Sequence, residues 1–218
     1  MQILSLYSNN DELDSKKLNK HINVVNQNSY RLLRLVNNLI DTTRIDSGFK
    51  DLNLQNKNIV EVIENITLST VDYVESKSRE IIFDTEIEEK ILAFDPDQME
   101  RIILNLISNA VKFTNPNDKI EVKIYDKKES ILISVKDTGI GISQDKQEII
   151  FERFRQVDPL YIRKNEGSGI GLSLVKSLVE MHNGNICVKS KCGEGTEFII
   201  EIPVKLVSKE ENESYIEE

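Results

Sequence analysis

The sequence predicts an α+β fold: a two-layer α/β sandwich, with helices on one face of a mixed, largely antiparallel sheet, preceded by a partial helical hairpin. Three observations predict it. Apolar residues recur at helical spacing in several separate segments. Short strand-like runs lie between those segments, mostly in adjacent pairs that hairpins can join. An apolar repeat typical of helix bundles occupies only the part of the chain before Gly48, so we expect a helical appendage there.

Composition and charge limit the classes of function. A chain of 218 residues with 39% hydrophobic and 30% charged residues can bury one sizeable core and carry a smaller helical appendage. The net charge is −9 and the basic residues form no stripe, so we expect no nucleic-acid partner. Cys187 and Cys192 lack metal-ligand or redox spacing, and no stretch resembles a signal peptide or membrane span. These features predict a cytoplasmic location, with any membrane anchor of the full-length protein outside this sequence.

The first predicted element is a long helix over about residues 14–47. Its apolar stripe alternates steps of four and three and comprises Leu18, Ile22, Val25, Ser29, Leu32, Val36, Leu39 and Thr43. So broad an apolar face needs a partner. We predict that residues 1–7 form the shortened first arm of an antiparallel hairpin, turning at 9–11, and that the hairpin supports a homodimer. Because glycine favours the position just past a helix end, Gly48 closes this domain, predicted at 1–48.

Residues 49–207 are predicted to form the sheet-containing domain. Asn58 is placed to cap a helix whose apolar positions extend to Val74, and Asp95-Pro96 opens a second helix with Ile102 to Val111 on its core face. A third helix spans 170–181. Strands are predicted at 80–84, 90–94, 119–125, 130–136, 186–190 and 196–204. The acidic tail, 208–218, is predicted to be disordered.

Two glycine clusters adjoin these elements: Asp137-Thr138-Gly139-Ile140-Gly141 after a strand, and Gly167-Ser168-Gly169-Ile170-Gly171 before a helix. Glycine permits a positive φ and a close approach of backbone to ligand. The pair therefore indicates a cradle for phosphate or nucleotide.

Three polar residues share one face of the predicted helix that Pro96 opens. Asn105 and Asn109 are one turn apart and Lys112 is three residues further on. Amide oxygens are hard ligands that suit magnesium, and a lysine balances phosphate charge. The set predicts a magnesium-and-phosphate surface. The alternative is that these side chains are merely solvated, and the neighbouring motifs count against it.

Five motifs in order resemble the N, G1, F, G2 and G3 boxes of sensor histidine kinases. They are Asn105-Leu-Ile-Ser-Asn109-Ala-Val-Lys112-Phe113, Asp137-Thr-Gly-Ile-Gly141, Phe151-Glu-Arg153-Phe154-Arg155-Gln156, Gly167-Ser-Gly-Ile-Gly171-Leu172 and Gly193-Glu-Gly195-Thr196-Glu-Phe198. The resemblance covers residues 50–205, and residues 29–48 resemble the second helix of the family's dimerisation and phosphotransfer domain. It implies the Bergerat-type ATP-binding fold shared with the Hsp90 chaperones, MutL and type II topoisomerases.

The resemblance also implies how Mg²⁺-ATP would be held at the base. Asp137 would accept a hydrogen bond from the adenine amino group, which discriminates adenine from guanine. Gly139 and Gly141 would let the purine approach. Phe113 would line the base pocket, and Thr196 would act near the adenine through water.

At the phosphate end, the resemblance implies Asn109 as the magnesium ligand, with Asn105 and Lys112 close to the metal and phosphates. The backbone of the second glycine cluster would hold phosphate at a helix N-terminus, through Gly167, Gly169, Gly171 and Leu172. A mobile lid over 142–166 would cover the ATP. Its candidates for contacting the γ-phosphate are Arg153, Arg155 and Gln156, which with Asn105 and Lys112 form the candidate catalytic set, while Phe151 and Phe154 would anchor the lid.

Asn105 distinguishes the expected reaction from ATP hydrolysis. In the ATPase relatives a glutamate stands here and activates water, and an uncharged amide cannot act as that base. The resemblance therefore implies an ATP-dependent protein-histidine kinase of a two-component system. Its partners would be a phosphoacceptor helix and then the receiver domain of a response regulator.

Neither histidine fits the family's acceptor pattern, His-Glu/Asp-x-x-Thr/Asn-Pro. His21 is followed by Ile22-Asn23-Val24, and His182 precedes Asn183-Gly184 at a helix end, so a structural role is predicted for each. We expect the sequence to begin beyond the phosphoacceptor of the full-length kinase, and hence no autophosphorylation. Two other functions stay open: a non-catalytic nucleotide-binding docking module, which the complete motif set disfavours, and a serine kinase of the anti-sigma-factor type, which the long first helix disfavours.

Overall fold

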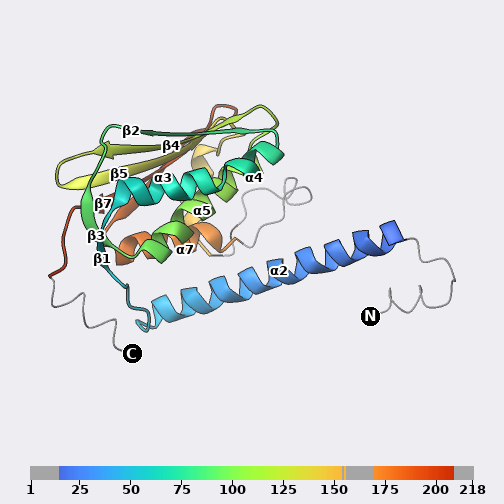
Figure 1. The fold of residues 1–218 in the computed structure, drawn as a ribbon, viewed down its shortest axis with the longest axis horizontal. Helices are drawn as coiled ribbons and strands as arrows, with labels where there is room; N and C mark the ends of the chain where they lie inside the picture. The colour runs from blue at the N-terminus through green and yellow to red at the C-terminus, as the bar shows by residue number, and fades with distance from the viewer. Residues whose placement is uncertain (1–14, 154, 156–168, 209–218) are drawn as a thin grey trace.

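The structure, a computed structural model, describes residues 15–153, 155 and 169–208. It has one five-stranded sheet covered on one face by helices, with a long helix extending from the domain (Figure 1). The helices are α2 (Ser15–Asp46), α3 (Ile59–Ser69), α4 (Val71–Ser76), α5 (Pro96–Phe113) and α7 (Gly171–Met181), with short 3-10 helices η1 (Gln144–Lys146) and η2 (Ile149–Phe151). The strands are β1 (Gln55–Asn58), β2 (Glu80–Thr85), β3 (Ile91–Phe94), β4 (Lys119–Asp126), β5 (Ser130–Asp137), β6 (Asn185–Lys191) and β7 (Gly195–Pro203).

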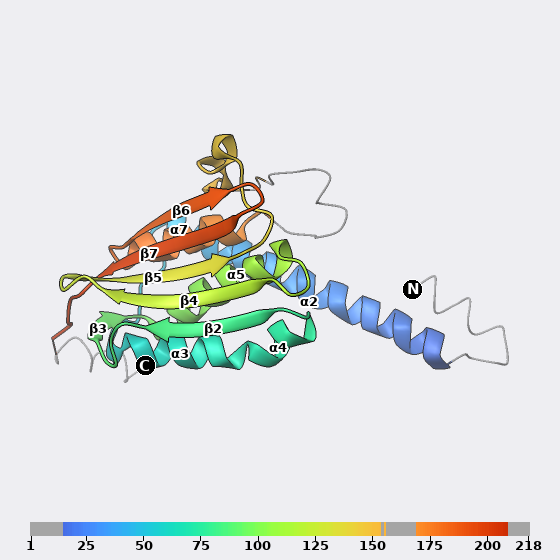
Figure 2. The ribbon, with the colours of Figure 1, turned by 90° about the horizontal axis from the view of Figure 1, so that it is seen from above.

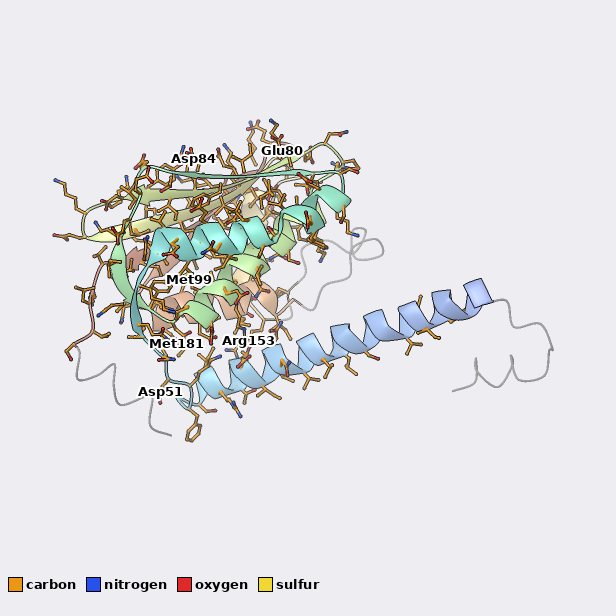
Figure 3. All side chains as sticks on the ribbon, viewed as in Figure 1. Asp51, Glu80, Asp84, Met99, Arg153 and Met181 are labelled. Carbon is orange, nitrogen blue, oxygen red and sulfur yellow. The ribbon has the colours of Figure 1, made fainter. Side chains whose placement is uncertain are left out.

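The sheet has the mixed character that the sequence predicts. Its strand order is β2-β4-β5-β7-β6; β2 pairs with β4 in parallel, and every other pair in it is antiparallel. Helices α3, α4, α5 and α7 lie together on one side of it (Figure 2). Charged side chains such as Glu80 and Asp84 lie on the side away from the helices (Figure 3), where they pair with Lys119 and Lys123. The two-layer α+β prediction is confirmed.

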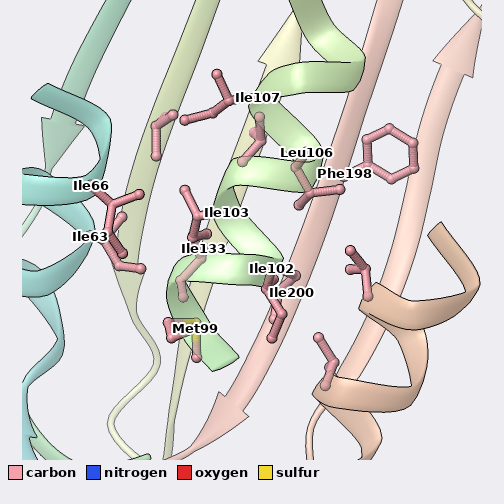
Figure 4. Close-up of a cluster of buried hydrophobic side chains, with 14 of the residues drawn as sticks. Ile63, Ile66, Met99, Ile102, Ile103, Leu106, Ile107, Ile133, Phe198 and Ile200 are labelled. Atoms are coloured by element: carbon pink, nitrogen blue, oxygen red, sulfur yellow. The ribbon is translucent and has the colours of Figure 1, made fainter. Parts of the chain in front are cut away.

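Helix α5 is the centre of the core. Met99, Ile102, Ile103, Leu106 and Ile107 point from it toward the sheet and α3, and each is at most 1% exposed (Figure 4). Burying each such side chain contributes roughly 1.5–3 kcal/mol, so this face fixes the helix against its neighbours. The opposite face of α5, which carries the polar motif, is therefore held in a defined position.

The start of α5 is capped as predicted, and the capping side chain also bonds to a residue outside the helix. The Asp95 carboxylate accepts hydrogen bonds from the backbone N–H groups of Asp97 (3.0 Å) and Gln98 (3.1 Å), and also from that of Asn53 (3.0 Å). These bonds satisfy amides that a helix start leaves unpaired. Asn58 caps α3 in the same way, accepting from Val60 N–H at 3.2 Å.

His182 has the structural role predicted for it. It is buried, its Nε2 accepts the backbone N–H of Asp95 (3.1 Å), and its Nδ1 lies 2.7 Å from the Leu178 carbonyl oxygen. Because Nε2 accepts, Nδ1 carries the hydrogen and donates it to Leu178. Burial lowers the pKa of the ring, which favours the neutral form. Both nitrogens are therefore bonded: Nδ1 fixes the ring on α7, and Nε2 joins the end of α7 to the start of α5.

Two elements differ from the sequence predictions. The helix predicted from Ile59 to Val74 is split at Thr70 into α3 and α4, because Thr67, Ser69 and Thr70 hydroxyls bond to backbone carbonyls and offer the chain an alternative to a continuous helix. Strand β1 was not predicted, since Gln55–Asn58 contains no apolar residue. It pairs with β3 in a separate two-stranded sheet.

Helix α2 confirms the long helix but not its hairpin partner. It ends at Asp46, and Gly48 follows with φ of +69°. Figures 1 and 2 show its C-terminal part beside the domain and the rest extending away. Several apolar side chains on it are about half exposed: Val25, Leu32, Leu33 and Leu39 among them. Residues 1–7 and 9–11, predicted as the first arm and turn, lie outside the described residues, as does the acidic tail beyond Ser208.

An ionic cluster joins α2 to the domain. Asp41 on α2 accepts from Arg101 of α5 and from Lys50 at 2.9 Å. Burial acts to raise the pKa of Asp41, but the two cations more than offset it and hold that pKa below its usual value. Within the described part of the chain, no helix is both long and apolar enough to cross a bilayer.

Candidate nucleotide-binding site

Asp137, the last residue of β5, is the centre of the candidate site. Asp137 is only 5% exposed. Its carboxylate accepts the backbone N–H of Gly139 at 2.8 Å and that of Thr196. Burial raises the pKa of this carboxyl to about 6, although both amide bonds act to lower it. Burial thus disfavours the ionised form, and a ligand that brings a further hydrogen-bond donor would stabilise it.

The predicted glycine loop lies tightly around Asp137. A Cβ on Gly139 would come within 2.3 Å of the Phe113 carbonyl oxygen and 2.9 Å of Asp137 Oδ1. Gly141 has φ of +68°, and a Cβ there would lie 2.0 Å from the Lys191 carbonyl oxygen. No residue larger than glycine fits at either position. The loop is consequently pressed between the end of α5 and the end of β6, which places the backbone of Phe113 against Gly139.

A second part of the site forms where α7 begins. Gly171 is the first residue of α7, and a Cβ on it would lie 3.1 Å from Asn105 Oδ1. The Asn105 Nδ2 donates to the Arg101 carbonyl oxygen (2.8 Å), so its oxygen is the atom directed to α7. Gly169, with φ of +69°, and Leu172 adjoin this helix start. The structure therefore brings Asn105 together with the second glycine cluster.

Helix α5 connects the two parts. Asn105, Asn109 and Lys112 are partly buried, in contrast to the fully buried face on the other side of the helix. The Lys112 ammonium lies 4.7 Å from the centre of the Phe113 ring, within the range of a cation–π contact. Phe113 lies eight residues after Asn105, which corresponds to about 12 Å along the helix.

The lid residues are described only in part. Phe151 packs edge-on against Phe198, with ring centroids 6.2 Å apart, so it anchors its segment to the core as predicted. Arg153 and Arg155 are exposed, and Arg155 pairs with Glu152 at 2.9 Å. Gln156, Gly167 and Phe154 lie outside the described residues, as does most of the predicted lid.

Two further residues belong to the site but were not predicted from the sequence. Ser190 Oγ accepts the Ile142 N–H (2.7 Å) and contacts both Gly195 and Thr196, while Gln147 Nε2 donates to the carbonyl oxygens of Ile142 (3.1 Å) and Ser190 (2.8 Å). Ser190 lies opposite Thr196 in the β6–β7 ladder. The predicted strands 186–190 and 196–204 contain both residues, and pairing their facing ends would have placed Ser190 opposite Thr196.

The family profile described as histidine kinase-, DNA gyrase B-, and HSP90-like ATPase matches residues 94–206. The chain belongs to this family. The match includes α5, both described glycine clusters and β5 to β7, which are the elements that build the site. The family resemblance predicted from the five motifs is confirmed.

Relatives of this histidine kinase-like domain are themselves histidine kinases. The chain is 36% identical to hybrid signal transduction histidine kinase D of Dictyostelium discoideum, over 89% of this chain and 13% of that protein. It is 30% identical to the circadian input-output histidine kinase CikA of Synechococcus elongatus, over 87% of this chain and 25% of that protein. It thus spans a quarter or less of the length of these relatives.

A solved structure supports the assignment of the whole described chain. Full-length ShkA in complex with AMPPNP aligns with a TM-score of 0.77 at 25% identity, over 92% of this chain and 41% of that one. The alignment extends beyond the residues that the family profile matches, so this ATPase-family domain and the helix before it share the arrangement of a histidine kinase.

The residues present fit a nucleotide. The tightly packed Gly139 and Gly141 hold the loop backbone beside a buried acceptor, and α7 offers the amides of a helix start beside an asparagine oxygen. Among the described residues, no group of three or more His, Cys, Asp or Glu side chains could hold a metal ion. A magnesium site formed by one side chain together with phosphates is consistent with this chemistry, since magnesium retains most of its waters.

Proposed function

We propose that this chain binds Mg²⁺-ATP and transfers its γ-phosphoryl group to a histidine of a sensor histidine kinase, for onward transfer to the receiver domain of a response regulator. The observation that carries the proposal is Asp137: a carboxylate whose burial disfavours its ionised form, beside a backbone that only glycine permits. Adenine supplies a further donor through its amino group. Phe113 lines the base, and Thr196 lies beside Asp137.

We assign the phosphates to the part of α5 that precedes Phe113, where the middle of the helix meets the start of α7. Asn109 holds magnesium through its amide oxygen, with Asn105 and Lys112 close by, and the backbone of Gly169, Gly171 and Leu172 receives phosphate oxygens. Bound magnesium would neutralise charge on the phosphates. Gly167 of the second glycine cluster and the lid residues Gln156, Arg153 and Arg155 are proposed to complete this part of the site.

Asn105 favours a kinase over an ATPase. Its Nδ2 is committed to the Arg101 carbonyl oxygen, so only the neutral amide oxygen faces the start of α7. Such an oxygen can orient a water or a phosphate but cannot take a proton as a general base. Hydrolysis is therefore slow, and the phosphoryl group passes to a protein acceptor that is brought to the site.

The acceptor histidine lies on another helix. His182 is excluded, because it is buried and both ring nitrogens are bonded. We propose that residues 1–48 belong to a dimerisation and phosphotransfer domain, separate from the catalytic domain at 49–207, and that the exposed apolar side chains of α2 pack in a homodimer. The site is proposed to function in the cytoplasm, with any membrane anchor in another part of the protein.

A phosphotransfer assay tests this function. The chain is incubated with γ-labelled ATP, magnesium and a separately purified histidine-kinase helical hairpin carrying the His-Glu/Asp-x-x-Thr/Asn-Pro pattern. We expect acid-labile label on the hairpin, none on His182, and loss of labelling in Asn109→Ala. Rapid release of labelled phosphate without any transfer would indicate an ATPase. Nucleotide binding without either reaction, even with a hairpin shown to bind, would support the docking module.

The pKa of Asp137 predicts how ATP affinity depends on pH. Adenine binds to the ionised carboxylate, whereas below about pH 6 the free protein holds this group protonated. The affinity should therefore fall with decreasing pH below 6, by up to about tenfold per pH unit, and level off above about pH 7. Titration calorimetry between pH 5 and 8 measures it. Asp137→Asn has no such proton, and an equal pH dependence in that variant would refute this source of the effect.

A further inference from the structure

Ser190 joins three segments at the edge of the candidate pocket. Its hydroxyl oxygen lies 2.7 Å from the Ile142 nitrogen in the glycine loop, 2.7 Å from the Gly195 carbonyl oxygen and 3.0 Å from Thr196 Oγ1. All three are within hydrogen-bond range. One side chain on β6 thus contacts both the loop after Asp137 and the start of β7.

All three contacts can be hydrogen bonds at the same time in only one arrangement of the hydrogens. A serine hydroxyl has one hydrogen and two acceptor lone pairs. The carbonyl oxygen of Gly195 can only accept, so the Ser190 hydrogen is directed to it. The Ile142 N–H donates to one lone pair of Ser190 Oγ. The remaining contact requires Thr196 to donate its own hydroxyl hydrogen to Ser190.

This arrangement limits what Thr196 offers to a ligand. Thr196 lies directly opposite Asp137 in the β5–β7 ladder, so the two side chains share one face of the sheet, and both are buried. With its hydrogen directed to Ser190, Thr196 Oγ1 presents only a lone pair beside Asp137. An ionised carboxylate also only accepts. The edge formed by Asp137 and Thr196 is therefore free of side-chain hydroxyl donors.

We propose that Ser190 is a positioning residue that sets the base specificity of the site, by holding the Thr196 hydroxyl as an acceptor and so selecting 6-aminopurines over 6-oxopurines. The proposal rests on the nucleotide-binding function proposed above. The adenine amino group donates to such an edge, whereas the 6-oxo group of hypoxanthine or guanine meets acceptors. Without Ser190 the Thr196 hydroxyl can rotate and donate to a 6-oxo group.

Calorimetry with ATP and inosine triphosphate tests the proposal, since the two bases differ only at the 6-position and the adjacent ring nitrogen. The titrations are run at pH 8 with magnesium, so that Asp137 is ionised. We expect the wild type to prefer ATP by at least about tenfold, and Ser190→Ala to reduce that preference about five- to tenfold. Ser190→Thr, which retains a hydroxyl, should keep the wild-type preference.

Two further variants distinguish a change in base specificity from a general loss of hydrogen bonds to the loop. Gln147→Leu removes hydrogen bonds to the same loop and strand but leaves the Ser190–Thr196 pair, so both affinities should shift by the same factor. In a Thr196→Val background, Ser190→Ala should leave the ratio of affinities unchanged. An equal loss of affinity for both nucleotides in Ser190→Ala, or a changed ratio that persists with Val at 196, would overturn the proposal.

The controls also distinguish failure of this inference from failure of the proposed function. A wild type that binds neither nucleotide contradicts the nucleotide site itself. A wild type that binds ATP, with a ratio that Ser190→Ala does not change, contradicts the role of Ser190 alone. Thermal melting of each variant reports whether it folds, and Ser190→Cys, with a similar volume and a weak donor, replaces Ser190→Ala if the alanine variant does not fold.

Discussion

Replacing Asp137 by Asn should stabilise the nucleotide-free protein at pH 8 while it abolishes most of the ATP affinity. The folded-state pKa of about 6 lies above the ordinary value of 3.8, because the site removes the ionised carboxylate from water. Stability linked to a raised pKa is fully present below pH 3.8 and is lost as the pH rises through about 6. The native carboxylate therefore costs up to about 3 kcal/mol above that pH, at about 1.4 kcal/mol per pKa unit.

Thermal melting at pH 8 and pH 4 checks the predicted change in stability. We expect Asp137→Asn to raise Tm at pH 8 and to approach the wild type near pH 4, since Asn still accepts the Gly139 N–H. Asp51→Asn, at an exposed carboxylate in the segment after α2, serves as the matched control and should change little at either pH. A lower Tm for Asp137→Asn at pH 8 would show that the carboxylate stabilises the fold and is not held there for a ligand.

Gly195→Ala should be among the most damaging single-methyl changes in the domain. Gly195 has φ of +101°, and a Cβ on it would lie 2.0 Å from the Asp137 carbonyl oxygen. The unfavourable φ costs about 1–2 kcal/mol and the collision a further 1–3 kcal/mol, because the β5–β7 ladder must move. The displaced backbone belongs to Asp137, so ATP affinity should fall as well.

Gly193→Ala is the matched control for this change. Gly193 lies in the same turn with φ of +79°, but nothing lies within 4 Å of the Cβ position. The Gly193→Ala variant should lose only about 1–2 kcal/mol of stability, which is the conformational cost of the positive φ, and should keep its ATP affinity. Urea unfolding and calorimetry compare the two. Equal destabilisation of both variants would show that the contact with Asp137 has no energetic consequence.

The sequence predicted the elements whose patterns are strong. Residue spacing was distinctive in three places. These are the apolar faces of α5 and α7, the paired strands β4–β5 and β6–β7, and the glycine loop after Asp137. What it missed depends on tertiary contacts. The all-polar β1 forms a strand because β3 offers it a partner, and α3 ends at Ser69 because successive hydroxyls compete for backbone carbonyls.

The candidate site likewise contains residues that a motif predicts and residues whose role depends on tertiary contacts. Asp137, Gly139, Gly141, Phe113 and Thr196 were predicted together from the family resemblance. The structure brings them close to one another, since Thr196 lies opposite Asp137 in the β5–β7 ladder and the glycine loop packs against the Phe113 backbone. Ser190 was not predicted, because a single serine in a strand has no distinctive pattern and acquires its role only through the register of β6 against β7. The raised pKa of Asp137 likewise results from burial, which the sequence alone does not report.

The measurement that tests the central claim most directly is titration calorimetry of the unmodified chain with ATP and with GTP, each with magnesium, at pH 8. The site predicts saturable binding of ATP with one nucleotide per chain and little binding of GTP. Asp137→Ala should lose a charge-assisted bond worth roughly 1.5–3 kcal/mol, or about one to two decades of affinity. Equal affinity for ATP and GTP, or an Asp137→Ala variant that binds ATP as the wild type does, would contradict the account.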